Sequence, residues 1–177
     1  MIPLNNNLYA LKRSQIRVYT NLARQTPDCA MLTIGEPDFD TPEAIKAAAI
    51  AALNDNQTHY APNQGTVSLR NAVAEFETAR GHRTKLEEVL VTIGACHGLF
   101  TAMLGVLNPG DEVIIPTPGF VLYESIADIA GAKVVKLDLT EHNFQIDAGA
   151  LNAAITEKTK AIIINSPNNP TGVVLNQ

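Results

Sequence analysis

The sequence predicts an α/β fold in which a mainly parallel β-sheet is sandwiched between helices. From about residue 88 onward, short apolar runs typical of strands alternate with segments that have helical periodicity. Such alternation supplies the long crossover connections that parallel strands need. The expected strands are also apolar throughout rather than on alternate residues, as is typical of strands covered on both faces.

The order of elements follows from the same patterns. Four short strands are expected, at Val89–Ile93, Val113–Ile115, Lys133–Leu137 and Ala161–Ile164. Helices are expected at about 14–24, 42–53, 66–80, 94–107, 120–130 and 148–155. In the second helix, one face repeats at helical spacing, which predicts a buried stripe of Ile45, Ala49, Ala52 and Leu53. Gly81 and Gly131 are expected to end the third and fifth helices.

Composition and charge exclude several classes of protein. The chain is 46% hydrophobic and 18% charged, which suits a folded globular protein. A net charge of −5 without a basic run argues against a nucleic-acid surface. The absence of a long apolar window or a signal-like start argues against membrane insertion and secretion. Two cysteines, Cys29 and Cys96, make no disulfide framework, so a cytoplasmic location is expected, and no metal site is expected.

Three unusual loops follow predicted strands, where ligands bind in open α/β sheets. They are Gly94-Ala95-Cys96-His97-Gly98, Pro116-Thr117-Pro118-Gly119-Phe120, and Asn165-Ser166-Pro167-Asn168-Asn169-Pro170-Thr171-Gly172. Parallel strands place such loops at one edge of the sheet. We therefore expect the three loops to share one ligand.

The first loop has three interpretations by itself. A glycine at a helix N-terminus can form an anion site from backbone N–H groups and the helix dipole. The same residues match Gly-x-Cys-x-Gly, the nucleophile elbow of hydrolases, with Cys96 as nucleophile. His97 points away from Cys96 on a helix, and Asp138 and His142 lie too close in sequence for a usual acid–histidine pair. A plain turn with a small residue at Cys96 is the third interpretation.

The other two loops carry more specific signals. Phe120 is suited either to stacking on a planar cofactor ring or to the core. The loop with two prolines and two adjacent asparagines follows an apolar Ile-Ile-Ile run directly. Prolines make this loop rigid, and asparagine side chains both donate and accept hydrogen bonds. This loop therefore indicates a defined polar contact to a ligand.

Taken together, these motifs resemble those of the class I/II, fold-type I pyridoxal-phosphate aminotransferases, in particular the aspartate-aminotransferase-like members. The resemblance covers nearly the whole chain in the family's order. The matching segments are Leu32–Pro42, His59–Pro62 with Gly65, Leu69-Arg70, Val91–Ala95, Pro109–Val113 and Asn165–Gly172. The first and last are the most specific, and they make a cysteine hydrolase with its elbow at Cys96 a distant alternative.

The resemblance implies roles for individual residues in binding pyridoxal 5′-phosphate. Backbone N–H groups of Ala95 and Cys96 would hold the phosphate, and Gly94 would permit its close approach. Phe120 would stack on the pyridine ring, and Asn169 would donate a hydrogen bond to the phenolic oxygen.

It also implies contacts to the substrate and to a second subunit. Gly35, together with Asn169, would lie against the substrate, with the Gly35 backbone at its carboxylate. Tyr60 would reach the phosphate bound by the partner subunit of a homodimer. The bonds Thr117–Pro118 and Asn169–Pro170 are candidates for the cis form, which suits tight ligand loops.

The implied reaction moves an amino group between an amino acid and a 2-oxo acid. Residues 1–40 would be an N-terminal arm with a small-domain segment, and 41–177 the N-terminal portion of a truncated large domain that binds the cofactor.

The resemblance places the catalytic residue of the family outside this sequence. The Schiff-base lysine follows the Asn-Pro-Thr-Gly sequence in the family, so it is expected beyond Gln177, and no lysine present here has its context. No residue of the chain is therefore expected to be catalytic, and the chain alone is expected to be inactive. A non-catalytic module of this fold and a carbon–sulfur lyase are the alternatives.

Overall fold

The computed structural model describes residue 11 and residues 15–176. These residues fall into two compact units: 15–92 form one, and 93–176 together with residue 11 form the other. Most of the first 14 residues of the expected arm lie outside the described residues, and so does Gln177, beyond which the family's lysine is expected. The position of that lysine therefore stays a prediction. Along the chain, the boundary between the units falls between Thr92 and Ile93. The expected division into 1–40 and 41–177 concerns the family's domains and stays a prediction.

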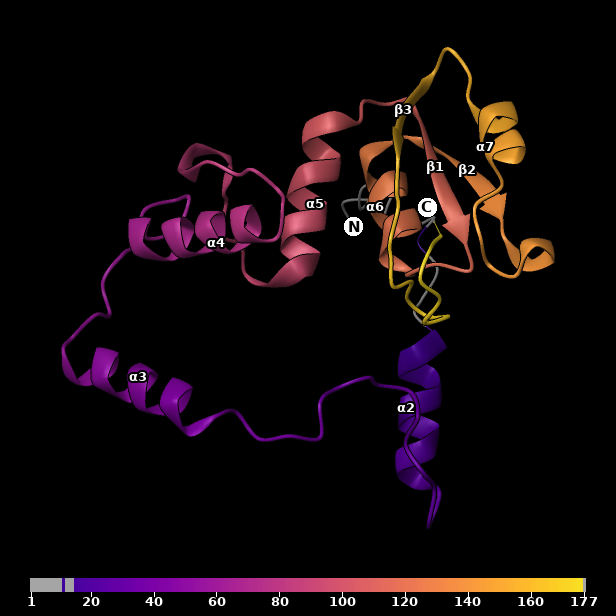
Figure 1. Cartoon of the computed structure of the whole chain (residues 1–177). Helices are drawn as coiled ribbons and strands as arrows, with labels where there is room; N and C mark the ends of the chain where they lie inside the picture. Colours follow the sequence, from indigo (N-terminus) through magenta and orange to yellow (C-terminus); the bar gives the residue numbers. More distant parts are fainter. Residues whose placement is uncertain (1–10, 12–14, 177) are drawn as a thin grey trace, which may run out of the picture. The chain divides into compact units, whose positions relative to one another are not determined.

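The C-terminal unit contains a three-stranded parallel sheet, which confirms the predicted α/β class. Its strands are β1 (Glu112–Thr117), β2 (Lys133–Asp138) and β3 (Thr159–Ile162). Both neighbours pair with β1 in parallel, in the order β2-β1-β3 (Figure 1). Because β1 lies between its neighbours, its backbone groups are used on both edges.

Helices alternate with the strands: one precedes β1, and the other two follow β1 and β2, as predicted. They are α5 (Gly94–Val106), α6 (Leu122–Ala130) and α7 (Ala148–Ala154), with a short 3₁₀ turn, η2, at Thr140–His142. The α6 helix ends at Gly131, whose φ of 73° is the left-handed conformation that glycine adopts without strain. Asp147 begins α7 by accepting a hydrogen bond from the backbone N–H of Ala150.

The central strand is buried on both faces. Val113 and Ile115 pack with Met103 of α5 and Ile126 of α6, whereas Ile114 packs in a second cluster with Leu137 and Leu139. The second cluster also contacts residues of α7. Neighbouring side chains of a strand point to opposite faces, so this division shows helices covering both sides of the sheet. The strand is apolar at successive positions because both of its faces are buried.

The expected strand at Val89–Ile93 is wrong. Its backbone groups have partners outside any sheet: the Val89 carbonyl accepts from Arg70 Nε at 2.9 Å, and the Val91 N–H donates to Gln64 at 3.0 Å. Arg70 also donates to the Leu86 carbonyl, at 2.6 Å, and is itself buried. The apolar run is an extended segment whose Val89 carbonyl is hydrogen-bonded by the buried guanidinium of Arg70. Sequence periodicity does not reveal a hydrogen bond of this kind.

The N-terminal unit is helical. It contains α2 (Gln15–Gln25), α3 (Glu43–Asn54), α4 (Val67–Ala79) and the 3₁₀ turn η1 (Leu86–Glu88). Gly81 follows α4 with a φ of 94°, as expected for a helix stop. The predicted burial of the stripe on α3 is wrong, because Ile45 is 59% and Leu53 63% exposed. Periodicity predicted the helix, but burial depends on what packs against it.

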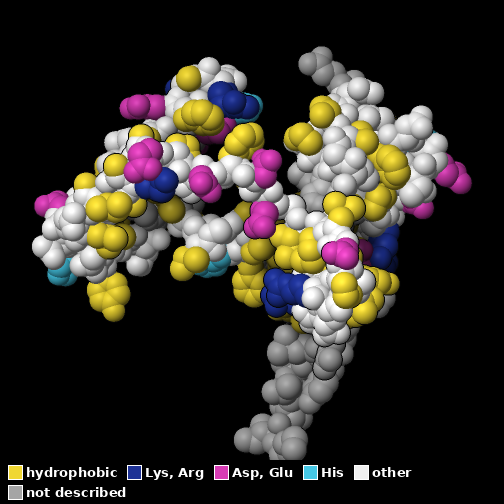
Figure 2. All heavy atoms as spheres, turned by 90° about the horizontal axis from the view of Figure 1, so that it is seen from below, with side chains coloured by type: hydrophobic (Ala, Val, Ile, Leu, Met, Phe, Trp, Pro, Cys, Tyr) yellow, Lys and Arg dark blue, Asp and Glu magenta, His cyan; other side chains and the backbone are white. Residues whose placement is uncertain are grey.

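Many hydrophobic side chains are exposed in the described part of the chain, and Figure 2 shows them scattered across the visible surface. Within residue 11 and residues 15–176, no helix combines the length and the apolar character that crossing a membrane requires.

Candidate functional site

The carboxyl end of β1 leads into a tight Pro/Gly loop, residues 116–120. At Gly119, a Cβ would lie 2.6 Å from the Pro116 carbonyl oxygen, so the loop has no room for a larger residue. The loop delivers Phe120, which is half-buried against the core cluster of α5 and α6. Its ring lies 5.7 Å from that of Tyr123 at an interplanar angle of 84°, an edge-to-face contact. Phe120 therefore packs against the core while it belongs to the loop, and the contact with Tyr123 on one side restricts the orientation of its ring.

The Asn/Pro loop, residues 165–172, follows β3 and is held by its own side chains. Asn165 Oδ1 accepts a hydrogen bond from the Asn169 backbone N–H at 2.9 Å. The Asn168 backbone N–H donates to Val173, and its carbonyl accepts from Gly172 at 2.7 Å. These bonds leave the side chain of Asn169 exposed at the surface of the loop. Rigidity of this loop was expected from its prolines, and the asparagines add to it.

A side-chain hydrogen bond joins the two loops. Asn168 Nδ2 donates to the Pro118 carbonyl at 3.1 Å and to Thr171 Oγ1 at 2.9 Å. The bonds Thr117–Pro118 and Asn169–Pro170 are cis, as anticipated, and so is Ser166–Pro167. The sheet thus brings together two of the three predicted loops. Asn165 and Asn168 were not singled out from the sequence, although the pair of adjacent asparagines was the available signal.

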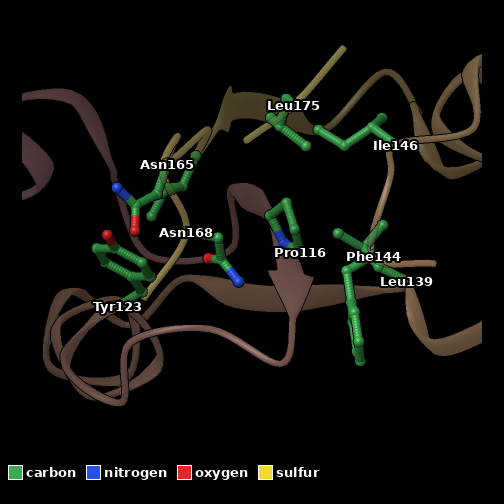
Figure 3. Close-up of a pocket in the computed structure, with 9 residues that line it drawn as sticks. Pro116, Tyr123, Leu139, Phe144, Ile146, Asn165, Asn168 and Leu175 are labelled. Atoms are coloured by element: carbon green, nitrogen blue, oxygen red, sulfur yellow. The ribbon is translucent and has the colours of Figure 1, made fainter. Parts of the chain in front are cut away.

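A small hollow lies beside this junction (Figure 3). Tyr123, Asn165 and Asn168 line one part of it, and the other part is apolar. The apolar residues are Pro116, Leu139, Phe144, Ile146, Ile163 and Leu175. The hollow lies at the carboxyl edge of the parallel sheet, the edge at which ligands bind in open α/β sheets.

The first turn of α5 lies at the same end of the sheet. In Figure 1, α5 begins at the end toward which β1 points, and it returns to the start of β1 through its C-terminus. Gly94 opens the helix with a φ of 76°, and Gly94, Ala95 and Cys96 are exposed. The N-cap residue, Ile93, makes no side-chain hydrogen bond to the first turn of the helix. Since the first N–H groups of a helix have no partner within it, this turn is suited to an anion.

His97 and Asp138 each make hydrogen bonds within their own segments of the chain. His97 Nδ1 accepts a hydrogen bond from the Ile93 N–H at 3.3 Å, so this ring nitrogen contacts the backbone of the preceding turn. Cys96 is a free, exposed thiol. Asp138 Oδ1 accepts from the backbone N–H and the hydroxyl of Thr140, which lowers the pKa of this carboxyl. The contacts of Asp138 are therefore local, and they lend the hydrolase alternative no support.

Gly35 and Tyr60 lie in the N-terminal unit. Both are exposed, and the Tyr60 side chain is fully accessible. Within the described ranges, His, Cys, Asp and Glu side chains do not gather in threes at a possible metal position.

The residues present fit a planar, anionic cofactor. A glycine-led helix N-terminus suits a phosphate, a held aromatic ring suits a heterocycle, and an exposed amide on a rigid loop suits a ring oxygen. In the C-terminal unit, two of these groups come from bonded loops and the third begins at the same end of the sheet.

Comparisons with known proteins identify chains that are similar to this one. Residues 27–177 match the family model "Aminotransferase class I and II". The chain is 46% identical over 169 residues to an aspartate aminotransferase of Pyrococcus horikoshii, covering 94% of this chain and 43% of that protein. It is 40% identical over 176 residues to a probable N-acetyl-LL-diaminopimelate aminotransferase of Bacillus subtilis, covering 98% and 45%.

A solved structure gives the same result. The aspartate aminotransferase from Thermus thermophilus with maleate superposes with a TM-score of 0.93 at 42% identity, over 100% of this chain and 48% of that one. The chain thus spans less than half the length of these relatives. A family model that matches most of the chain, together with relatives above 40% identity, is sufficient to decide membership. The chain belongs to the class I and II aminotransferase family.

Proposed function

We propose that residues 94–172 form the part of a pyridoxal 5′-phosphate site that holds the phosphate, the ring and the phenolic oxygen. The parent activity is amino-group transfer between an amino acid and a 2-oxo acid. The observation that carries this proposal is the hydrogen bond of 3.1 Å that joins the Asn/Pro loop to the Pro/Gly loop at the carboxyl edge of the sheet. A cytoplasmic location goes with the proposal.

The first turn of α5 is the proposed phosphate site. The backbone N–H groups of Ala95 and Cys96 donate to the phosphate, and the helix dipole favours its negative charge. At Gly94 a Cβ would meet nothing within 4 Å in this structure, so the side of the turn is open to a ligand. Because the contacts are made by the backbone, the thiol of Cys96 is not needed for binding.

Phe120 and Asn169 are the proposed ring contacts. Phe120 stacks on the pyridine ring, while its edge-to-face contact with Tyr123 fixes the orientation of the Phe120 ring. Asn169 donates its side-chain amide to the phenolic oxygen, and Asn165 fixes its backbone. When bound, the cofactor supplies an electron sink for the carbon that loses a proton. The chain's own part is to bind, to orient and to tune that ring.

The substrate and the second subunit are proposed to engage the N-terminal unit. The Gly35 backbone lies against the substrate carboxylate, and Tyr60 reaches the phosphate held by the partner of a homodimer. A fully accessible tyrosine is consistent with a role outside its own unit. The proton-carrying lysine of the family has no counterpart between Met1 and Gln177. The roles proposed for residues 1–177 are therefore in binding the cofactor and the substrate.

Binding is tested with 4′-deoxypyridoxine 5′-phosphate, a ring phosphate without the reactive aldehyde, followed by amide NMR. Shifts are expected at Ala95 and Cys96. Replacing Phe120 with Leu should weaken binding about two- to tenfold, as loss of an aromatic contact does. The matched control is Phe76→Leu, on the exposed face of α4, which should bind normally. Shifts at scattered residues, or equal effects of the two variants, would refute the proposed site.

The expectation that no lysine of residues 1–177 forms the Schiff base is tested separately. Pyridoxal phosphate followed by borohydride reduction should label surface lysines weakly and in parallel, as mapped by peptide mass spectrometry. A stoichiometric adduct at one lysine would contradict the proposal.

A further inference from the structure

We propose that Asn168 is a positioning residue that holds Phe120 and Asn169 in register with each other as the two ring contacts. This inference rests on the proposed function, because it concerns the same ligand. The two loops lie 50 residues apart in sequence at the point where Asn168 joins them. Asn169 itself takes no part in that junction, since its side chain is exposed.

The argument begins with the donors of Asn168. A primary amide has two N–H donors on one nitrogen. In Asn168, this nitrogen contacts the Pro118 carbonyl at 3.1 Å and Thr171 Oγ1 at 2.9 Å. Its backbone N–H donates to the carbonyl of Val173, the residue after the Asn/Pro loop, and its carbonyl accepts from the N–H of Gly172. Every polar group of this half-buried residue except the amide oxygen therefore has a structural partner.

A hydrogen bond to Pro118 can affect the position of Phe120. Pro118 lies two residues before Phe120, and Gly119 between them is packed against the Pro116 carbonyl. A tight loop with no free space transmits a displacement at Pro118 to the Phe120 ring. On the other side, Asn168 is adjacent to Asn169, whose N–H is held by Asn165. One side chain thus sets the separation of the two contacts.

The first turn of α5 is expected to be independent of this junction. Its anion contacts come from backbone N–H groups at the start of a 13-residue helix, and the helix is held by its own packing, including Met103 in the core. Loss of the Asn168 bond should therefore weaken recognition of the ring without weakening recognition of phosphate. A residue needed only for folding would weaken both.

The test uses Asn168→Asp, which keeps the shape of the side chain but removes both donors. The matched control is Asn71→Asp, an equal change of charge at an exposed position of α4. Ligand-free amide spectra are recorded first. We expect shifts at Gly119 and Phe120 in Asn168→Asp alone, with the amides of β1 unchanged, which also reports that the variant is folded.

Affinity is then measured for two probes, 4′-deoxypyridoxine 5′-phosphate and inorganic phosphate. Asn168→Asp should bind the ring phosphate about tenfold more weakly, the size of effect expected when one contact to the ring is weakened. Its affinity for inorganic phosphate should stay within about twofold of the unsubstituted chain, since no phosphate contact is lost. The Asn71→Asp control should match the unsubstituted chain for both probes.

Two results would overturn the positioning role alone. Unchanged Gly119 and Phe120 amides would show that the loops are not coupled, and an equal loss of affinity for both probes would show general destabilisation. Failure of the unsubstituted chain to prefer the ring phosphate over inorganic phosphate would instead refute the proposed function. The role of Asn168 toward the ring would fall with it, while the ligand-free spectra would still decide whether the loops are coupled.

Discussion

Two glycines of α5 provide a sharp test of the turn that is proposed to hold phosphate. Gly94 opens the helix with a φ of 76°, whereas Gly105 lies near its end, outside the left-handed region. A Cβ at either position would meet nothing within 4 Å. Steric clashes are therefore the same for both, and the same substitution, Gly→Ala, isolates the backbone conformation.

The two variants should change stability in opposite directions. An L-residue in the left-handed region costs about 1–2 kcal/mol, so Gly94→Ala should destabilise the C-terminal unit by about 1 kcal/mol once the stiffer unfolded chain is counted. Alanine in a helix is favoured over glycine by about 0.5–1 kcal/mol, so Gly105→Ala should stabilise it. The variants should differ by about 2 kcal/mol, which is roughly 30-fold in the unfolding equilibrium.

Amide hydrogen exchange of Val113, Ile114 and Ile115 measures this difference within the C-terminal unit, because these β1 residues are fully buried. The measurement avoids treating a chain of two units as a single cooperative transition. Stabilisation by Gly94→Ala, or equal changes from both variants, would show that the helix does not begin through a left-handed residue. That result would remove the geometric basis of the phosphate turn.

Three further predictions concern the core, the first residue of the central strand and the thiol. Ile114→Ala should destabilise the C-terminal unit by about 2–5 kcal/mol and Ile114→Val by about 0.5–1.5 kcal/mol, since the side chain is fully buried; urea titration followed at β1 amides checks this. Glu112→Gln should lower stability at neutral pH, because hydrogen bonds from Lys133 and Thr156 lower the pKa of Glu112 in the folded state. A lowered folded pKa stabilises the protein above the unfolded pKa, and this effect is lost as pH falls through the folded value, so thermal melts of the variant and the unsubstituted chain should converge in acid. Cys96→Ala should leave affinity for 4′-deoxypyridoxine 5′-phosphate within about twofold and ester hydrolysis unchanged; a marked loss of either would revive a role for the thiol.

Prediction from sequence worked best where local pattern and burial coincide. The strand around Val113–Ile115 is apolar throughout because helices cover both faces of β1. The starts and stops of α4, α5 and α6 fall within a few residues of the expected positions, because glycine and helical periodicity are local signals. The same reasoning failed at Val89–Ile93, where the buried Arg70 side chain and the Gln64 carbonyl make hydrogen bonds that a neighbouring strand would have made.

The amino-acid sequence by itself determined the α/β class, the three loops and, through their motifs, the family. These features are encoded in the order and spacing of residues along the chain, so no contact between distant segments is needed to recognise them. The tertiary structure alone decided that the loops after β1 and β3 are bonded to each other, that Asn168 makes the bond, and that Ile45 and Leu53 remain exposed. The physical reason is that the sequence around Asn168 does not indicate which acceptor its side-chain amide will find. Only the pairing of the strands brings the Pro118 carbonyl oxygen to 3.1 Å from Asn168 Nδ2.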